Sequence, residues 1–264
     1  MAGFFYRRRD MHITLTGNLG SGKSTICKIL KEKYGFEIYS TGTVQRQLAG
    51  EFGLSVLEMN KLMCSDHKYD HLIDDTTARI SRENPDKNIV FDSRLAWNFV
   101  EKSFKVFLSV SLDEAAKRVY ADASRGEVES YKSLEDCRQK LKERADNENM
   151  RYAEIYNVHY FDFDNYNLIL DSTNADPSLL AETIVRLAAQ SYESGEETRQ
   201  ILFSPRRLGE AGDGDRQYRS DRLYPEGVVI IKKEEDDYAA VDGLEVLKEA
   251  AAKDYSFVDC FLTE

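Results

Sequence analysis

The sequence predicts an α/β fold: a five-stranded parallel sheet with helices on both faces and a helical lid, followed by a small C-terminal ββαβ unit. Between Met11 and Ala189, short β-rich segments alternate with longer segments of helical spacing. This alternation is typical of a parallel sheet that is covered on both faces. A glycine-rich turn joins the first strand to the first helix, and after Pro225 the pattern changes to two strands, a helix and a strand.

Five strands of the sheet are predicted from short apolar and β-branched runs: His12–Gly17, Glu37–Tyr39, Asn88–Asp92, Lys105–Ser111 and Asn167–Asp171. Helices are predicted from apolar residues at helical spacing and from capping signals: Ser24–Tyr34, Thr43–Phe52, a helix opened by Ser55-x-x-Glu58, Asp70–Arg82, Leu112–Asp122, a charged helix from Ser133 to about Met150, and one from Asp176-Pro177 to about Ala189.

The C-terminal quarter of the chain has a different character. Residues 190–224 are rich in Gly, Arg, Ser and Asp and lack strong periodicity, so a linker with short structured pieces is predicted there. The ββαβ unit follows from four segments: Gly227–Lys232, Tyr238–Val241, Gly243–Ala252 and Phe257–Leu262. We therefore predict a first domain over residues 11–189, a linker over 190–224 and a small α+β module over 225–264.

Composition and charge exclude several classes of protein. The chain has 264 residues, of which 42% are hydrophobic and 11% aromatic, which supports a packed core and excludes wholesale disorder. The net charge of −11 argues against a general nucleic-acid or anionic-membrane binder. From Ser191 onward 18 acidic residues stand against 10 basic ones, whereas before it 29 stand against 26. The first domain is therefore nearly balanced, and local basic clusters there can still bind phosphates.

Targeting signals and cysteine usage indicate a cytoplasmic protein. No apolar run approaches the roughly 20 residues of a membrane helix, and no apolar segment follows Arg7, Arg8 and Arg9, so neither a membrane span nor a secretory signal is expected. The four cysteines are scattered without C-x-x-C spacing, which favours a reducing compartment over a disulfide framework.

The strongest motif is the glycine-rich turn G-x-x-x-x-G-K-[ST], which is typical of a P-loop NTPase-type fold when it lies between a strand and a helix. Its residues are Gly17, Asn18, Leu19, Gly20, Ser21, Gly22, Lys23 and Ser24. The glycines let backbone N–H groups point at phosphate oxygens, and the helix N-terminus adds its positive end. Lys23 is predicted to reach the β- and γ-phosphates, and Ser24 to bind Mg²⁺. The motif, extended by Thr25, therefore predicts a site for ATP and Mg²⁺.

A second group for the metal is predicted at Asp92. This residue ends the third strand, at the carboxyl edge where ligands bind in such sheets. We assign Asp92 to Mg²⁺, directly or through water. The alternative is a cap on the strand end, because an acid often follows an apolar strand.

Arginines near the strand ends and in the charged helix indicate a second anion: Arg46, Arg94, Arg118, Arg125, Arg144 and Arg151. Planar guanidinium groups grip phosphate bidentately and offset the repulsion between two polyanions. The phosphate of a nucleoside monophosphate is already largely a dianion at pH 7, because its second pKa is about 6. Such an acceptor requires alignment and charge neutralisation, not a general base. The alternative for any one of them in the lid is an exposed partner of a neighbouring acid.

Five stretches carry a resemblance to the cytidylate kinase-like group of P-loop nucleoside monophosphate kinases over residues 11–189. They are the P-loop, Ser40–Arg46 (STGTVQR), Asp92–Ala96 (DSRLA), Lys142–Arg144 with Arg151-Tyr152, and Leu170–Thr173 (LDST). The resemblance implies that Thr41 and Arg46 hold the acceptor nucleotide and that Arg94 binds its phosphate. It implies that Arg144 and Arg151, in the lid helix, close over both phosphates, and that Leu170–Thr173 lie beside the donor base. Together with Lys23 and Arg118, these lid arginines form the expected catalytic set.

Val228–Leu262 resembles the ParB/sulfiredoxin-like fold, with Asp242-Gly243 opening its helix. Leu244, Glu245 and Val246 follow that glycine, where relatives with catalysis carry His or Arg. The resemblance therefore implies a binding or structural module without chemistry of its own, and a protein partner for it is left open.

The sequence thus predicts an ATP- and Mg²⁺-dependent kinase whose second substrate is a nucleoside monophosphate, with CMP or a related pyrimidine nucleotide preferred. Two alternatives remain. The acceptor could be a hydroxyl of a small metabolite, with Asp92 as general base. The P-loop domain could instead report ATP occupancy to the C-terminal unit without catalysis.

Overall fold

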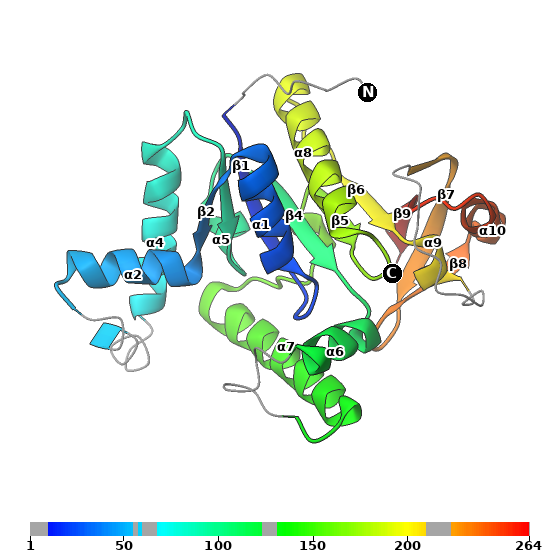
Figure 1. Ribbon diagram of the computed structural model, residues 1–264, viewed down its shortest axis with the longest axis horizontal. Helices are drawn as coiled ribbons and strands as arrows, with labels where there is room; N and C mark the ends of the chain where they lie inside the picture. The colour runs from blue at the N-terminus through cyan, green and yellow to red at the C-terminus, as the bar shows by residue number, and fades with distance from the viewer. Residues whose placement is uncertain (1–9, 55–57, 60–67, 123–130, 210–222, 264) are drawn as a thin grey trace.

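The computed structural model of the protein describes residues 10–54, 58–59, 68–122, 131–209 and 223–263. Strands are β1 (His12–Gly17), β2 (Glu37–Ser40), β3 (Ile89–Asp92), β4 (Phe104–Ser109), β5 (Leu168–Asp171), β6 (Gln200–Phe203), β7 (Leu223–Lys233), β8 (Tyr238–Asp242) and β9 (Phe257–Thr263). Within these described ranges the nine strands form one sheet in the order β2-β3-β1-β4-β5-β6-β9-β7-β8 (Figure 1).

The predicted parallel sheet is confirmed. Strands β2, β3, β1, β4 and β5 pair in parallel, with β1 at the centre. The register places Leu15 of β1 and Ser40 of β2 opposite Asp92 of β3, so that these three strands end at the same edge. This carboxyl edge carries the glycine turn that follows β1, and it is where α/β sheets bind their ligands.

The helices are α1 (Lys23–Tyr34), α2 (Thr41–Glu51), α4 (Lys68–Glu83), α5 (Ala96–Phe99), α6 (Leu112–Ala121), α7 (Leu134–Tyr156), α8 (Pro177–Ser194), α9 (Pro205–Leu208) and α10 (Leu244–Ala252), with a 3₁₀ turn at Phe163–Asn165. Two helices, α7 and α8, begin where the predicted caps Ser133 and Asp176 place them. The side chains of Ser111, Ser133 and Asp176 accept N-terminal amide bonds of α6, α7 and α8. Two predicted features, the cap at Ser55 and Arg125, lie outside the described residues.

Two helices are longer than the sequence predicts. Helix α7 continues past Met150 to Tyr156, because Tyr152 and Tyr156 pack against an aromatic cluster at that end. Asn157 ends it in the left-handed conformation. Helix α8 continues to Ser194, where Gly195 with φ +70° provides the terminating residue.

The described part of the predicted linker over 190–224 contains two short elements, β6 and α9, and β6 belongs to the sheet. Leu202 and Phe203 of β6 are fully buried, and β6 pairs in parallel with β5. The predicted ββαβ unit is present as β7, β8, α10 and β9, and it extends the same sheet, because β9 pairs antiparallel to β6 and β7 pairs parallel to β9. These strand partners are distant in sequence, and local patterns do not reveal them. That residues 225–264 form a module of their own stays a proposal.

Helices cover both faces of the sheet. Helices α1 and α8 pack on one face through a core that includes Leu15, Leu30 and Ile184. The other face carries an aromatic core with α5, α9 and α10 around it. Helices α6 and α7 lie at the carboxyl edge below the glycine turn (Figure 1). Among the helices of the described ranges, none combines the length and the apolar character that crossing a bilayer requires.

His12, the first residue of β1, is a buried titratable group. Its Nδ1 lies 2.8 Å from the hydroxyl of Ser81, and its Nε2 lies 3.0 Å from the carbonyl of Asn84. Burial lowers the pKa of His12, and the hydrogen bond to Asn84 opposes this shift only in part. The folded chain therefore holds this imidazole neutral at a pH where the unfolded chain binds a proton.

This difference predicts how stability depends on pH. Because the pKa is lower in the folded state, the unfolded state binds more protons as the pH falls through the ordinary histidine value of 6.5, and the free energy of unfolding declines there. In His12→Gln the decline between pH 7 and pH 5 is expected to be shallower than in the wild type, as measured by urea unfolding at several pH values. His159→Gln, which removes an exposed histidine, is the control. Identical slopes in wild type and His12→Gln would contradict the assignment.

Candidate functional site

The glycine turn after β1 has a geometry that only glycine permits at two positions. Gly17 has φ +152°, and a Cβ atom there would lie 2.3 Å from the carbonyl oxygen of Leu108. Gly20 has φ +76°, and a Cβ atom there would lie 2.9 Å from the backbone of Ala115. The turn is therefore pressed against β4 on one side and α6 on the other. Leu19 packs against a small apolar core that α6 and α7 form between them.

Backbone and side-chain bonds fix this turn to the end of β4. The amide of Asn18 donates to the carbonyl of Leu108 (3.0 Å), and the Oδ1 atom of Asn18 accepts from the amide of Val110 (3.1 Å). Gly22, with φ +84°, is the N-cap of α1, and open space lies where its side chain would be. The hydroxyl of Ser21 is buried and has no hydrogen-bond partner among the described residues. An open helix N-terminus beside an unpaired hydroxyl fits the oxygen atoms of a phosphate chain.

Lys23 is a partly buried basic residue in this turn. Its Nζ atom lies 3.4 and 3.5 Å from the carbonyls of Gly17 and Asn18. Burial lowers the pKa of Lys23 to about 7; repulsion from Arg94 adds to this shift, and attraction to Asp92 opposes it. An ammonium group that is desolvated to this extent gains most from an anion that enters the turn.

Ser24 and Asp92 are the predicted magnesium ligands. Ser24 and Thr25 are exposed in the first turn of α1, and Asp92 is partly buried at the end of β3. Burial raises the pKa of the Asp92 carboxyl, whereas Lys23 and Arg94 lower it. No group of three or more His, Cys, Asp and Glu that could hold a metal is found in the part of the chain that the structure describes. One hydroxyl and one carboxylate beside a phosphate site fit Mg²⁺, which takes its other ligands from phosphates and water.

Arg94 is held against the glycine turn from both its backbone and its side chain. The Thr16 hydroxyl donates to the carbonyl of Arg94 (3.1 Å), and the Trp97 indole donates to the same oxygen (3.1 Å). Its guanidinium NH1 donates to the carbonyl of Gly17 (2.8 Å). The guanidinium group of the predicted acceptor arginine is therefore held against the glycine turn.

Glu148 joins Arg94 to the lid helix. The Nε atom of Arg94 donates to one carboxylate oxygen of Glu148 (3.0 Å), and the Nε atom of Arg144 donates to the other (3.1 Å). Glu148 is not among the residues predicted above, although its position four residues after Arg144 is a local signal for a pair. In the structure one carboxylate lies between two guanidinium groups that are expected to grip phosphate.

Arg118 lies on the other side of the glycine turn. Its Nε atom donates to Glu114 (2.9 Å), and its NH2 group donates to the carbonyls of Ser172 and Thr173 (2.8 and 2.9 Å). Arg118 thus pairs with a neighbouring acid, as the alternative above expects. It also contacts the loop that the resemblance places beside the donor base.

Three predicted arginines lie at exposed positions: Arg46 on α2, and Arg144 and Arg151 on α7. Arg46 donates to the Thr43 hydroxyl (3.2 Å), and Thr41, the first residue of α2, is also exposed. Arg151 follows Arg144 by about two turns of α7. The structure therefore brings Lys23, Asp92 and Arg94 together and joins Arg144 to them through Glu148, whereas Arg46 and Arg151 stand exposed on α2 and α7.

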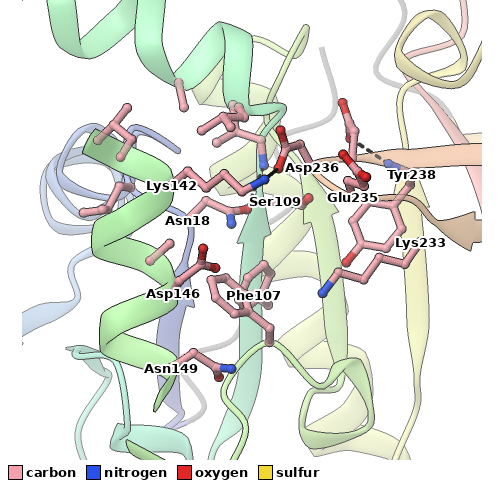
Figure 2. A pocket seen from close by; sticks show the side chains of 18 of the residues that line it. Asn18, Phe107, Ser109, Lys142, Asp146, Asn149, Lys233, Glu235, Asp236 and Tyr238 are labelled. Atoms are coloured by element: carbon pink, nitrogen blue, oxygen red, sulfur yellow. Dashed lines mark hydrogen bonds and ion pairs between the residues drawn. The ribbon is translucent and has the colours of Figure 1, made fainter. Parts of the chain in front are cut away.

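A cavity of about 210 Å³ lies beside the glycine turn, between the end of β4, α7 and the turn that joins β7 to β8 (Figure 2). Lys142 and Arg138 of α7 both pair with Asp236 of that turn, the latter at 2.9 Å. The side-chain oxygen of Asn149, on the same helix, is buried there without a partner among the described residues. The C-terminal unit thus contacts the predicted lid directly, which no local pattern indicated.

Comparison with known proteins supports these assignments at the level of family. Residues 12–174 match the cytidylate kinase-like family. The chain is 31% identical over 175 residues to a cytidylate kinase of Methanobrevibacter smithii, which covers 66% of this chain and 96% of that one. It is 32% identical over 174 residues to an S-adenosylmethionine-dependent nucleotide dehydratase of Lacinutrix mariniflava, but only 35% of that protein is covered.

The fold is also found among solved structures. An uncharacterized protein from Eubacterium ventriosum superposes with a TM-score of 0.50 and 16% sequence identity, over 68% of this chain and 98% of the other. At that identity the likeness concerns the fold alone.

The bridging carboxylate of Glu148 leads to a prediction about anion binding. If this carboxylate occupies the place between Arg94 and Arg144 that an anion takes, Glu148→Gln removes a competitor. We expect the Kd for inorganic pyrophosphate, measured by isothermal titration calorimetry, to fall about tenfold, which corresponds to about 1.4 kcal/mol.

Glu143→Gln is the matched control, because Glu143 is exposed on the same helix and accepts only from Gln139 among the bonds described. Weaker pyrophosphate binding in Glu148→Gln would show instead that the carboxylate orients the two arginines.

Proposed function

Because the chain belongs to the cytidylate kinase-like family, we propose that it transfers the γ-phosphoryl group of ATP to a nucleoside monophosphate, with CMP or a related pyrimidine nucleotide preferred. The observation that carries this proposal is the environment of Lys23. The partly buried amino group of Lys23, whose pKa is lowered to about 7, lies within a glycine turn, next to an arginine held by the same turn. Such a site is built for an anion with more charge than one carboxylate provides.

On the donor side, the amides at the start of α1 and Lys23 would hold the β- and γ-phosphates of ATP. Ser24 and Asp92 would hold Mg²⁺, which supplies charge neutralisation between those phosphates when it is bound. Arg118 and the loop at Ser172 and Thr173 would border the nucleoside end of ATP.

On the acceptor side, Arg94 would bind the phosphate of the monophosphate, with Thr41 and Arg46 at the rim. The phosphate takes the place of the Glu148 carboxylate between Arg94 and Arg144. The nucleophile is already a phosphate oxygen anion, so the arginines align it and offset its repulsion with the γ-phosphate. Closure of α7 with Arg144 and Arg151 would exclude water from the reacting groups.

One observation favours a second candidate, a kinase for a hydroxyl-bearing small molecule. Burial raises the pKa of Asp92, and a carboxylate with a raised pKa is better suited to accept a hydroxyl proton. Under this alternative Asp92→Asn abolishes turnover but leaves the affinity for ATP with Mg²⁺ nearly unchanged. Under the main proposal the same variant weakens the Mg²⁺-dependent part of ATP binding as well.

The three free cysteines that the structure describes, Cys27, Cys137 and Cys260, are all buried. They agree with the proposed reducing, cytoplasmic location.

A panel of nucleoside monophosphates tests the proposed reaction. ADP release is measured with the full-length protein, ATP and Mg²⁺ against CMP, dCMP, UMP, AMP and GMP, and the highest kcat/KM is expected with CMP or a related pyrimidine nucleotide. No turnover with any of them at micromolar enzyme would reject the proposal. ATP binding with hydrolysis that is independent of every acceptor would indicate a nucleotide-sensing role.

Arg94 gives the corresponding prediction for a single residue. Arg94→Lys keeps the charge but loses the guanidinium fork, so kcat/KM for the monophosphate is expected to fall about 100-fold. Arg199→Lys is the control. Arg199 is exposed, pairs with Asp164 and lies just before β6, at the end of that strand away from the carboxyl edge. Equal activity of Arg94→Lys and wild type would remove Arg94 from the acceptor site.

A further inference from the structure

We propose that Arg207, which lies outside the family-matched residues 12–174, is a positioning residue that holds the donor-nucleoside side of the cleft in shape. This inference rests on the proposed function, because it assigns ATP to the P-loop. It also gives the C-terminal part of the chain a role in ATP binding that the family match does not cover.

The place of the donor nucleoside follows from the order of the strands. The triphosphate of ATP lies at the P-loop after β1, which has β3 on one side and β4 on the other. The β3 side carries Arg94 and its contact to Glu148, where the acceptor phosphate is proposed. The nucleoside of ATP therefore extends over the ends of β4 and β5, where Arg118 contacts Ser172 and Thr173.

Arg207 is buried behind this side of the edge, with 4% of its side chain exposed. Its NH1 group donates to Asp171 at the end of β5 (2.7 Å) and to the Ser109 hydroxyl at the end of β4 (2.9 Å). Its Nε and NH2 groups donate to Asp237 (2.9 and 2.6 Å) in the turn between β7 and β8. The ring of Phe203 lies 4.7 Å from the guanidinium carbon. One guanidinium group thus joins the ends of two parallel strands to the C-terminal unit.

Asp171 connects Arg207 to the loop that follows β5. Its Oδ1 atom accepts from Arg207 and from both the amide (3.0 Å) and the hydroxyl (2.6 Å) of Thr173. Its Oδ2 atom accepts from the amide of Ser204 (3.0 Å). A fully buried carboxylate of this kind requires a cation nearby, and Arg207 supplies it.

Thr173 connects this loop to the start of α6 and to Arg118. Its hydroxyl accepts from the amide of Ser111, which caps α6, and its carbonyl accepts from Arg118 of the same helix. The chain of contacts therefore runs from Arg207 through Asp171 and Thr173 to Arg118. If Arg207 is removed, Asp171 loses its cationic partner, and the positions of the donor-side loop and of Arg118 are no longer fixed through it. The glycine turn keeps its own bonds to β4.

This separation defines the test. Binding of a non-hydrolysable imido analogue of ATP is compared with binding of inorganic triphosphate, both with Mg²⁺, by calorimetry without any acceptor. For Arg207→Lys and Arg207→Met the Kd of the ATP analogue is expected to rise about tenfold or more, and that of triphosphate to stay within twofold, because triphosphate reaches only the P-loop. Arg207→Lys is expected to be the milder, since Lys restores charge but not the fork.

Two further variants keep the result interpretable. Arg207→Met combined with Asp171→Asn removes both buried charges together, so the fold is retained when Arg207→Met alone leaves Asp171 uncompensated. Arg206→Met is the matched control, since Arg206 lies on the same short helix and its NH2 group donates to Asp254 (3.2 Å). Thermal melting of each variant accompanies the titrations.

The outcomes are distinct. Selective loss of the ATP analogue with unchanged triphosphate binding supports the proposal, even if no monophosphate is ever phosphorylated. Unchanged binding of both probes overturns it, as does an equal loss of both. Failure of Arg207→Lys and of the double variant to fold also overturns it, because Arg207 then serves the fold and not the site.

Discussion

The site depends on a group of cations that the fold gathers at the carboxyl edge of the sheet. The Nζ atom of Lys23 lies within 3.5 Å of two backbone carbonyls, and the carboxylate of Glu148 pairs with both Arg94 and Arg144. Arg118 donates two of its bonds to backbone carbonyls. A carbonyl is a weaker partner for a cation than a carboxylate or phosphate. We therefore expect these cations to gain from a ligand that carries more negative charge than a carboxylate, such as a polyphosphate.

Steric constraint places this charge. Because Gly17 and Gly20 press the turn against β4 and α6, the turn cannot relax toward solvent to relieve Lys23. The same contacts make α6 part of the site, since Arg118 leaves that helix toward the loop after β5. Thr16 and Trp97 hold the backbone of Arg94 in the same way. The cations are thus held in place before any ligand arrives, which lowers the reorganisation that binding requires.

The sequence predicted the parts of this arrangement that depend on local patterns. The glycine motif, the ends of the parallel strands and the caps at Ser133 and Asp176 are each encoded within a few residues. The contact of Glu148 with Arg94 and that of Arg207 with Asp171 join side chains that are 54 and 36 positions apart, and a single sequence shows no pattern for them. Strand β6 was missed because it is four residues long and lies in a segment rich in loop-forming residues. The pairing of β6 with β9 is likewise a property of the assembled sheet.

The continuous sheet changes how the C-terminal unit must be understood. A module joined only by a linker would make no contact with the lid helix. Here Asp236 pairs with Arg138 and Lys142, in the N-terminal half of α7. Glu148 and Arg151 lie in the C-terminal half of the same helix. A motion of α7 as one rigid body would have to break the pairs with Asp236 or carry the turn between β7 and β8 with it. The other end of α7 is held as well, because Tyr152 and Tyr156 pack against the aromatic core and the Tyr156 hydroxyl donates to Asp74 (2.6 Å). We infer that the C-terminal unit helps to set the position of the lid helix, since its turn anchors the N-terminal half of α7.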